Sequence, residues 1–483
     1  MTLRVVLVNT NEMKPPIAPI ALDYLAGALA GEGYEVRIAD LCLAEDAVGA
    51  LRETLRGPAP RVVGLTFRNS DDCFWPSAKS FIPRLAEIVR TVRTLTDAPI
   101  VLGGAGFSVF HSAILEAVGA DYGIVGDGEA ALIGLLRALE DGGNLANVPG
   151  LVWRASNGSG QSFIRNPPLW GPPRISPARQ WVDNRRYFRE GGQAGVETKR
   201  GCDRMCPYCA DMLCKGTRLR PRPPEEVAVE MENLLRMGCE VLHLCDAEFN
   251  VPPEHAAAVC EEMIRRGLGE RLRWYTYACV SGFSKELARV MRRAGCVGIN
   301  FGADSANAEM LAVYGRRHTR EDIARAARWC QENKMRVMFD LLLGGPGETE
   351  ETLRETIEFM RSVKPDCVGA ALGVRVYPGL PFAGRLMRDG PLASNPHLRF
   401  GPPSADMPPG SDSLLRPAFY IDRALGDAPA QLVRRLIGGD KRFFEPMDEQ
   451  TAENYNYNDN QTLVEAIRRG ARGAYWDILR QLR

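Results

Sequence analysis

Three cysteines lie close together in the segment VETKRGCDRMCPYCADM, where Cys202, Cys206 and Cys209 have the spacing C-x₃-C-x₂-C. Three thiolates on one short loop can each bind a different iron of a cubane, which leaves the fourth iron without a protein ligand. An iron with an open position can bind a small molecule, whereas a fourth cysteine would close the cluster. The spacing therefore predicts a [4Fe–4S] cluster that takes part in chemistry.

Zinc is the alternative occupant of this loop. Zinc prefers four protein ligands, usually in two separated pairs, and Cys214 would then be the fourth ligand. On this hypothesis the chain is a zinc-stapled α/β binding protein without catalysis. The loop follows a predicted strand, at the end of a βα unit where catalytic residues gather, and this position favours the iron–sulfur cluster.

The composition is that of a folded protein without a strongly charged surface. Of 483 residues, 45% are hydrophobic and 25% are charged, with 60 basic and 60 acidic side chains. A zero net charge without long basic runs argues against a nucleic-acid partner. No apolar run approaches the roughly 18 residues of a membrane span, and the amino terminus resembles a strand more than a signal peptide. We therefore expect a cytoplasmic protein, in which the 13 cysteines do not form a disulfide framework.

Residues 1–140 alternate short β-branched segments with segments of helical periodicity. The predicted strands are 4–9, 34–40, 61–67, 99–104 and 122–129. Such alternation indicates a parallel sheet with helices on both faces, so we predict a doubly wound, Rossmann-like α/β domain. Glycines cluster where the last two strands end, and the carboxyl ends of the strands form the ligand crevice in sheets of this kind.

A second series of strands and helices follows a connecting segment. Residues 141–194 are predicted to be a linker with a hairpin at 150–165, whose turn is Asn157-Gly158. Residues 195–382 contain six predicted strands, at 195–199, 240–245, 272–280, 297–302, 336–344 and 367–377. This number indicates a (βα)₆-type partial TIM barrel. Residues 383–483 are predicted to be a small, mostly helical cap, with helices near 427–437 and 460–482.

The cysteine spacing at the head of a βα barrel, with Tyr208 before the last cysteine, resembles the radical S-adenosylmethionine (SAM) superfamily. Further segments resemble its cobalamin-dependent subgroup, in which a cobalamin-binding domain precedes the barrel. These segments are 15–25, VLGG (101–104), VGDGEAAL (125–132), LLLGGPGETEETL (341–353) and RVYPGLPF (375–382). The resemblance covers roughly residues 1–382.

The resemblance implies a cofactor set and a group of site residues. The cluster would bind SAM at its open iron, and an electron from the reduced cluster would cleave a C–S bond of SAM. A flavodoxin or ferredoxin-type electron donor is therefore an expected partner. The residues implied around SAM are Tyr208 against the adenine, Asp246 or Glu248 near the amino group, Asp304 and Ser305 near the ribose or methionine part, and Gly344, Gly345, Arg375 and Tyr377 at the border of the pocket.

Cobalamin is implied by the subgroup, but the motif D-x-H-x-x-G, whose histidine binds cobalt from below, is absent. The five histidines stand at other positions, namely 111, 243, 255, 318 and 397. Members of the subgroup often lack this histidine too. Two hypotheses therefore stay open, one in which the first domain binds cobalamin and one in which it keeps the fold without the cofactor.

Cys245 and Cys279 fall near the carboxyl ends of predicted barrel strands, where substrates bind. One interpretation is two buried strand cysteines. The other is a pair of catalytic thiols that transfer hydrogen to a substrate radical or bind a soft centre such as trivalent arsenic. That second interpretation suits cobalamin-independent transfer of the 3-amino-3-carboxypropyl group of SAM, or a radical rearrangement.

The loop 68–76 follows the third strand of the first domain and contains charged and aromatic residues. It either lines the cofactor face and closes the barrel mouth, or packs Phe74 and Trp75 on the neighbouring domain. The leading prediction for the whole chain is a cobalamin-dependent radical SAM methyltransferase. It would methylate an unactivated carbon of a small molecule in natural-product biosynthesis, with cobalamin as the methyl carrier.

Overall fold

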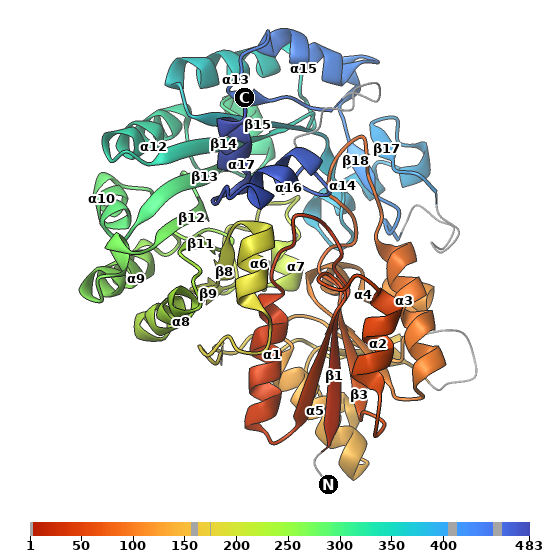
Figure 1. Ribbon diagram of the computed structural model, residues 1–483. Helices are drawn as coiled ribbons and strands as arrows, with labels where there is room; N and C mark the ends of the chain where they lie inside the picture. Colours follow the sequence, from red (N-terminus) through yellow and green to blue (C-terminus); the bar gives the residue numbers. More distant parts are fainter. Residues whose placement is uncertain (1–2, 156–162, 174, 404–412, 448–455) are drawn as a thin grey trace.

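The computed structural model describes residues 3–155, 163–173, 175–403, 413–447 and 456–483. Within these ranges the chain forms two seven-stranded sheets and two small sheets. The first large sheet occupies the lower part of Figure 1, and the second lies above it, with the last helices between the two. This arrangement confirms the predicted α/β class with two successive parallel sheets.

The first sheet has the strand order β2-β1-β3-β4-β5-β6-β7. Its parallel strands are β1 (Arg4–Asn9), β2 (Glu35–Asp40), β3 (Val62–Thr66), β4 (Ile100–Gly103) and β5 (Tyr122–Ile124). The predicted hairpin extends this sheet, because β6 (Leu151–Arg154) pairs antiparallel with both β5 and β7 (Phe163–Arg165). Its turn residues, Asn157 and Gly158, lie outside the described residues.

Helices cover both faces of the first sheet, as the alternating pattern requires. One face packs against α1 (Ile20–Gly31) and α5 (Glu129–Asp141). The other face packs against α2 (Ala47–Leu55), α3 (Ile82–Leu95) and α4 (Ala105–Val118). The chain changes direction between β1 and β3, and the carboxyl ends of these strands leave a crevice there.

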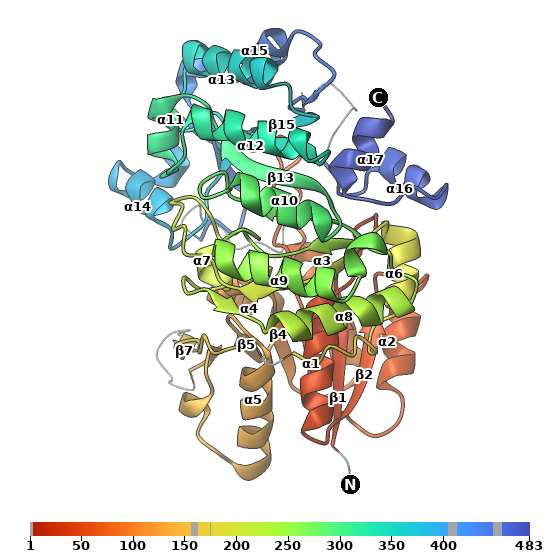
Figure 2. The same ribbon diagram turned by 90° about the vertical axis from the view of Figure 1, so that its left-hand side faces the viewer.

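The second sheet is entirely parallel, with the order β19-β15-β14-β13-β12-β11-β8. Its strands are β8 (Ala194–Val196), β11 (Val241–Leu244), β12 (Arg273–Ala278), β13 (Cys296–Asp304), β14 (Arg336–Leu343), β15 (Cys367–Leu372) and β19 (Phe443–Phe444). The outer helices are α8 (Pro224–Arg236), α9 (Pro253–Arg265), α10 (Lys285–Arg293), α12 (Arg320–Glu332) and α13 (Glu350–Val363). Figure 2 shows α8, α9, α10 and α12 side by side over one face of this sheet.

Shorter elements connect and extend these two layers. They are α6 (Asn184–Gly191), the ribbon of β9 (Lys199–Arg200) and β10 (Arg220–Pro221), α7 (Asp211–Cys214), α11 (Ala308–Val313), α14 (Pro381–Arg388) and α15 (Pro429–Ile437). The small three-stranded sheet consists of β16 (Val374–Arg375), β17 (Leu398–Phe400) and β18 (Ala418–Tyr420).

Four predicted elements are wrong in extent. The strand expected at 195–199 divides into β8, which ends at Val196, and β9, which begins at Lys199 and pairs with β10 in a separate sheet. The other three differ because of glycine. The strand expected at 367–377 breaks at Gly373, whose φ of 92° turns the chain into the separate strand β16. The strand expected at 122–129 ends at Ile124, since Gly126 has a φ of 86°. The segment 460–482 forms two helices, α16 (Gln461–Arg468) and α17 (Tyr475–Gln481), with Gly470 and Gly473 at positive φ between them.

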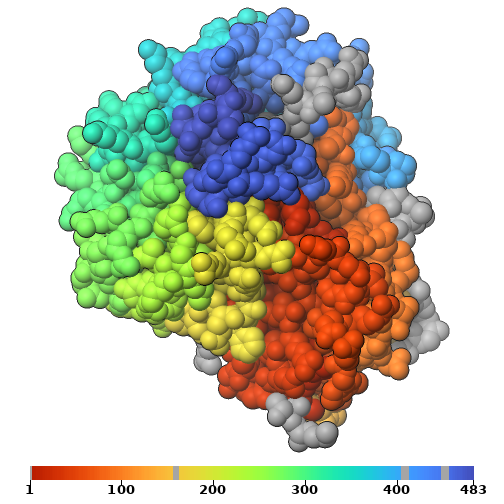
Figure 3. Space-filling view, in the orientation of Figure 1, coloured from red at the N-terminus to blue at the C-terminus, as the bar shows by residue number. Residues whose placement is uncertain are grey.

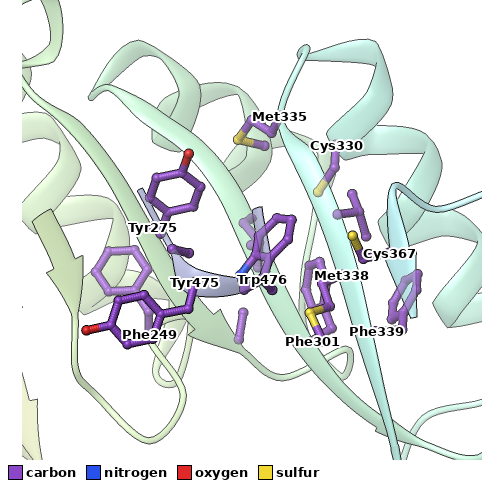
Figure 4. Packing of buried hydrophobic residues seen from close by; sticks show 14 of the residues in the cluster. Phe249, Tyr275, Phe301, Cys330, Met335, Met338, Phe339, Cys367, Tyr475 and Trp476 are labelled. Carbon is purple, nitrogen blue, oxygen red and sulfur yellow. The ribbon is translucent and has the colours of Figure 1, made fainter. Parts of the chain in front are cut away.

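The carboxyl-terminal helices are part of the barrel core. Trp476 and Tyr475 of α17 lie among the core residues of the second sheet (Figure 4). The ring of Trp476 meets Tyr275 edge-on at 5.9 Å, and the Tyr275 hydroxyl donates to Asp477 Oδ2 at 2.8 Å. In the space-filling view these helices cover the junction of the two domains (Figure 3).

A buried ionic network joins the first domain to the barrel. Arg179 Nε lies 2.9 Å from Asp23 Oδ2 of α1, and its NH1 lies 2.8 Å from Glu230 Oε1 of α8. All three side chains are fully shielded from solvent. Tyr24 adds a hydrogen bond from its hydroxyl to Glu230 Oε1 at 2.7 Å. One guanidinium therefore neutralises carboxylates from both domains.

Replacing this guanidinium should destabilise the whole chain. We expect Arg179→Ala to lower the free energy of unfolding by about 3 kcal/mol or more, because the buried Asp23 loses its counter-charge and Glu230 keeps only that of Arg222. Urea denaturation of anaerobically purified protein measures this loss. Arg137→Ala is the matched control, since its ion pair with Glu32 is largely exposed and should contribute less than about 1 kcal/mol. Similar losses in the two variants would contradict a stabilising role for the network.

Candidate active site

The backbone of the loop after β9 holds the three cysteines. Gly201 has a φ of 89°, and a Cβ at this position would overlap the backbone of the returning strand. The N–H of Cys202 donates to the carbonyl of Gly216 at 3.1 Å. The N–H of Cys209 donates to the carbonyl of Cys206 at 3.1 Å, which closes a turn. The sequence therefore forms a rigid loop that presents three thiols from one short segment.

The electrostatics of the loop indicate that the thiols are neighbours. Burial is the main cause that raises the pKa of Cys202 to about 11, and the adjacent Cys206 contributes to this rise. Burial also raises the pKa of Cys209, to which Asp211 and the other two thiols contribute. Binding of a metal to such thiols releases their protons. Among the described residues, no three His, Cys, Asp or Glu side chains come close enough to share one metal ion. A cubane does not need that closeness, because each thiolate binds a different iron.

Glu248 lies beside this loop, following β11. It raises the pKa of the Cys202 and Cys206 thiols and also that of Cys279. Its own pKa is raised to about 7 by burial and by nearby carboxylates, against the opposing effect of Arg316. Glu248 is thus a protonatable carboxyl next to the cysteine loop, and it is one of the two acids considered for the amino group of SAM.

Asp246, the other acid, is engaged within the protein. Its carboxylate accepts the N–H of Thr198 at 2.8 Å and lies 2.8 Å from Lys199 Nζ. Burial raises the pKa of Asp246, but Lys199 and Thr198 outweigh this effect and lower it overall. The predicted contact of Asp246 with SAM stays a prediction, and the structure gives this carboxylate a second, internal role.

Tyr208 and Asp304 contact each other, whereas Ser305 faces away from them. The Tyr208 hydroxyl donates to Asp304 Oδ2, and Arg316 Nε and NH2 lie 2.5 and 3.0 Å from the Asp304 carboxylate. The hydroxyl of Ser305 lies 3.0 Å from Thr356 Oγ1 of α13 and is buried. The ring of Tyr208 therefore has a fixed orientation beside the cysteine loop.

The segment GGPGE after β14 forms a turn that its own glutamate fixes. Gly344 has a φ of 91°, and its N–H donates to Glu348 Oε2 at 3.0 Å. The N–H of Gly345 donates to the hydroxyl of Tyr314 at 3.1 Å. A Cβ at Gly345 would overlap the Tyr314 hydroxyl, so this position requires glycine.

Arg375 and Tyr377 bind the loop 68–76 of the first domain. Arg375 NH2 lies 2.9 Å from Asp71 Oδ2, and the Tyr377 hydroxyl lies 2.8 Å from Cys73 Sγ. Phe74 and Trp75 pack at the edge of the barrel core. Both interpretations of the loop are therefore consistent with the structure, since it packs on the barrel and also lines a cavity at the barrel mouth.

This mouth cavity measures about 320 Å³ and brings several predicted site residues together. Tyr208, Arg375 and Tyr377 line it together with Cys209 of the cluster loop and Cys73 of the first domain. The remaining predicted residues do not line it. The contribution of the first domain to this cavity could not be found from spacing, because Cys73 and Tyr377 are 304 positions apart.

Cys245 and Cys279 lie in different surroundings. Cys245 lines the cavity between the two domains, and its thiol donates to the carbonyl of His243 at 3.3 Å. Cys279 is 2% exposed, and its N–H donates to Asn250 Oδ1 at 2.8 Å. Burial raises the pKa of these thiols to about 11 and about 12, respectively, so both hold their protons at neutral pH. Their catalytic role stays a prediction.

The cavity between the domains lies at the carboxyl edge of the first sheet and measures about 220 Å³. The first domain contributes an apolar slot and a rim of glycines, and the barrel contributes charged side chains. The slot residues are Leu7, Leu22, Leu65, Ile124 and Leu132, the glycines are Gly103, Gly104, Gly126 and Gly128, and the barrel residues include Glu197, Arg200 and Lys215. An apolar slot of this size suits the aromatic base of cobalamin, and the polar, glycine-rich mouth suits the edge of its much larger, amide-bearing ring.

The chain has two domains built on parallel sheets, a C-x₃-C-x₂-C loop and a cavity between the domains. These features define a radical SAM enzyme with a cobalamin-binding domain. The model of the B12 binding domain matches residues 6–136, and that of the Radical SAM superfamily matches residues 196–360. Tryptophan 2-C-methyltransferase of Streptomyces laurentii is 33% identical, over 79% of this chain and 74% of that protein.

Two solved structures of the radical SAM methyltransferase TsrM from Kitasatospora setae match nearly the whole chain. The form with tryptophan and the SAM analogue aza-SAM bound has 31% identity and a TM-score of 0.90, and covers 99% of this chain and 98% of that chain. The form with cobalamin and a [4Fe–4S] cluster bound has 30% identity and a TM-score of 0.89, covering 100% and 98%. The chain therefore belongs to the cobalamin-dependent radical SAM methyltransferases.

Family membership confirms the predicted enzyme class and its cofactors, which are a [4Fe–4S] cluster, SAM and cobalamin. The two alternative hypotheses, a zinc-stapled binding protein and a cobalamin-independent transferase, are therefore wrong for this chain. The missing D-x-H-x-x-G motif therefore does not indicate a domain without the cofactor. Across the part of the chain that the structure describes, no helix is both long and apolar enough to span a bilayer.

The cysteine triad can be tested against its neighbour. Cys202→Ala, Cys206→Ala and Cys209→Ala should each abolish cluster loading and SAM cleavage, because a cubane then retains only two thiolates. Cys214→Ala is the matched control on the same loop and should keep wild-type iron content. Iron and sulfide analysis after anaerobic reconstitution measures both. Comparable iron loss in Cys214→Ala would restore a four-thiolate site.

Glu348 should make stability depend on pH. Burial raises its pKa to about 7, although the N–H of Gly344 and the Thr352 hydroxyl oppose this. The folded state binds the proton more tightly than the unfolded chain, so the stabilisation is complete below about pH 4 and is lost as the pH rises towards 7, by up to about 3 kcal/mol. Melting temperatures from about pH 5 to about pH 8 should therefore fall more for the wild type than for Glu348→Gln.

The control is Glu350→Gln, which should keep the wild-type pH dependence. Glu350 is exposed and lies two residues after Glu348, at the start of α13. An unchanged pH dependence in Glu348→Gln would show that this carboxyl does not titrate on unfolding.

Proposed function

We propose that this chain methylates carbon C2 of the indole ring of tryptophan or of a close tryptophan derivative. The observation that carries this proposal is the nearly full-length similarity to the TsrM structure with tryptophan bound, at a TM-score of 0.90. The relative from Streptomyces laurentii, named for the same reaction, supports it over 79% of this chain.

The mouth cavity is suited to a planar aromatic substrate. Its lining includes the rings of Phe74, Trp75, Tyr208 and Tyr377. Aromatic side chains bury large apolar surfaces and orient a planar ring through stacking or edge contacts. Arg375 passes within 4.8 Å of the Tyr377 ring and 5.6 Å of Phe110, so the aromatic wall is held by a buried cation.

Different parts of the chain would bind the cluster, bind cobalamin and shape the substrate site. Cys202, Cys206 and Cys209 would hold the cluster, and the interdomain cavity would hold cobalamin, which supplies a cobalt centre able to carry a methyl group. The loop 68–76 is held at the barrel mouth, because Asp71 and Cys73 bind Arg375 and Tyr377. The task of the chain is thus to hold the methyl carrier and one carbon of the substrate in contact.

The electron donor and the location belong to the same proposal. A flavodoxin or ferredoxin-type protein would reduce the cluster, and the site of action would be the cytoplasm. The balanced charge of the chain, with 60 basic and 60 acidic residues, gives no sign of a nucleic-acid substrate.

Tryptophan turnover tests the proposal directly. Anaerobically reconstituted enzyme with SAM carrying a deuterated methyl group should convert tryptophan into labelled 2-methyltryptophan, with one S-adenosylhomocysteine for each product. Mass spectrometry measures both. A substrate already methylated at C2 is the control and should give no product. Accumulation of 5′-methylthioadenosine, or SAM consumption without labelled tryptophan, would contradict the proposal.

A further inference from the structure

Alternate residues of β13 and β14 face the interior of the barrel. Phe301 and Phe339 stack on each other at 5.6 Å within the core. Their neighbours Asn300 and Asp340 therefore point to the opposite face, as side chains do in a strand. There Asn300 Nδ2 donates to Asp340 Oδ2 at 2.7 Å. The strand sequence RVMFDLLLG thus brings one carboxylate into the barrel interior.

This carboxylate lacks the cation that three other aspartates near the barrel mouth have. Asp304 pairs with Arg316, Asp246 with Lys199, and Asp71 with Arg375. No ion pair between described residues includes Asp340. Asn300 is 4% exposed, and its Oδ1 has no hydrogen-bond donor among the described residues. Burial raises the pKa of Asp340 to about 6, with Asn300 opposing and Asp304 adding to the rise. Asp340 itself is only partly buried, and no cation of the described residues offsets its charge, which indicates a role outside folding.

The neighbouring strands leave space beside Asp340. The register places Gly302 of β13 and Gly369 of β15 next to it, so neither strand covers the carboxylate with a side chain. Arg316 reaches over Gly302, but its guanidinium is paired with Asp304. Two positions further along β14, on the same face, Leu342 lines the mouth cavity. Asp340 therefore lies directly below the cluster side of the barrel mouth.

Tyr277 provides an accessible aromatic face in the same interior. It is 44% exposed, and its ring lies 4.9 Å from that of His243. The hydroxyl of Tyr277 lies near Asp340 and Cys245, whose charges add to the rise of its pKa. Cys245 also lines the interdomain cavity. Asp340 thus lies two residues from Leu342 of the mouth cavity, and Tyr277 lies near Cys245 of the interdomain cavity. A substrate that meets both spaces would pass close to these two side chains.

We propose that Asp340 binds the ammonium group of an amino-acid substrate, that Asn300 orients this carboxylate, and that Tyr277 packs against the aromatic part of the substrate. The ammonium supplies the positive charge that the carboxylate lacks and has three N–H donors for the acceptors around it. This assignment rests on the proposed function and names the groups that would recognise an amino acid instead of a plain indole.

Substrate analogues and one variant test the assignment. Holoenzyme with S-adenosylhomocysteine should bind tryptophan about 30-fold or more tightly than indole-3-propionate, which lacks the ammonium. In Asp340→Asn this preference should fall to near unity, mainly through weaker binding of tryptophan. In turnover the variant should raise KM for tryptophan more than it lowers kcat. Titration calorimetry and initial rates measure these quantities.

Matched controls separate recognition from folding. Asp366→Asn removes a carboxylate at the opposite edge of the same sheet, where it pairs with Arg336, and should leave the preference unchanged. Asp340→Asn should keep wild-type iron content and SAM binding, and should be at least as stable at neutral pH, because it removes an unpaired carboxyl. A loss of stability with an unchanged preference would assign Asp340 a structural role and overturn the proposal.

The two proposals fail in different ways. If the wild type neither binds nor methylates tryptophan, the proposed substrate is wrong and this assignment is wrong with it. If the wild type methylates tryptophan but does not prefer it to indole-3-propionate, or Asp340→Asn keeps the full preference, only the assignment of Asp340 is overturned. If there is no ammonium effect, but the wild type binds 1-methyltryptophan more weakly than tryptophan and Asp340→Asn removes this difference, Asp340 accepts the indole N–H and the assignment to the ammonium is overturned.

Discussion

The carboxyl edges of two parallel sheets face each other, and the chemistry of the chain depends on keeping them so. A parallel sheet exposes its ligand-binding loops at one edge only, so a reaction that joins two cofactors needs the two edges to meet. The cavity of about 220 Å³ and the cysteine loop both lie in this junction. Charged contacts fix the junction, since Arg179 binds Asp23 across it and Arg375 binds Asp71.

Buried ion pairs between domains cost free energy of desolvation, but they specify how the domains are oriented relative to each other. An apolar interface tolerates sliding, whereas a guanidinium that must face two carboxylates allows one relative orientation. The fully shielded Arg179, with Asp23 on one domain and Glu230 on the other, has this property. The carboxyl-terminal helix α17 adds apolar packing to the barrel core through Trp476. Together these contacts fix the two domains relative to each other, and they would thereby hold a bound substrate close to the methyl carrier, as transfer requires.

Local patterns in the sequence predicted the parts that local chemistry determines. The cysteine triad follows from spacing alone, and the β-branched segments predicted both sheets. The two-residue strand β19 was not predicted, because Phe443 and Phe444 form a strand only by pairing with β15. The break at Gly373 was missed because glycine within an apolar segment does not itself reveal a positive φ. The pairing of Arg375 with Asp71, 304 positions away, depends on domain docking and leaves no trace in spacing.

The position of Asp340 is not explained by a contribution to the stability of the fold. In the apolar strand RVMFDLLLG a single aspartate is a visible signal, but a sequence cannot show whether a cation faces it. Most acids at the barrel mouth have acquired such a cation, and these pairs contribute to a rigid wall around the site. A carboxyl left unpaired beside two glycines lowers stability without improving the packing. Such a residue is retained when its missing partner arrives with the substrate, so the unsatisfied group is the part of the wall that is complementary to the ligand.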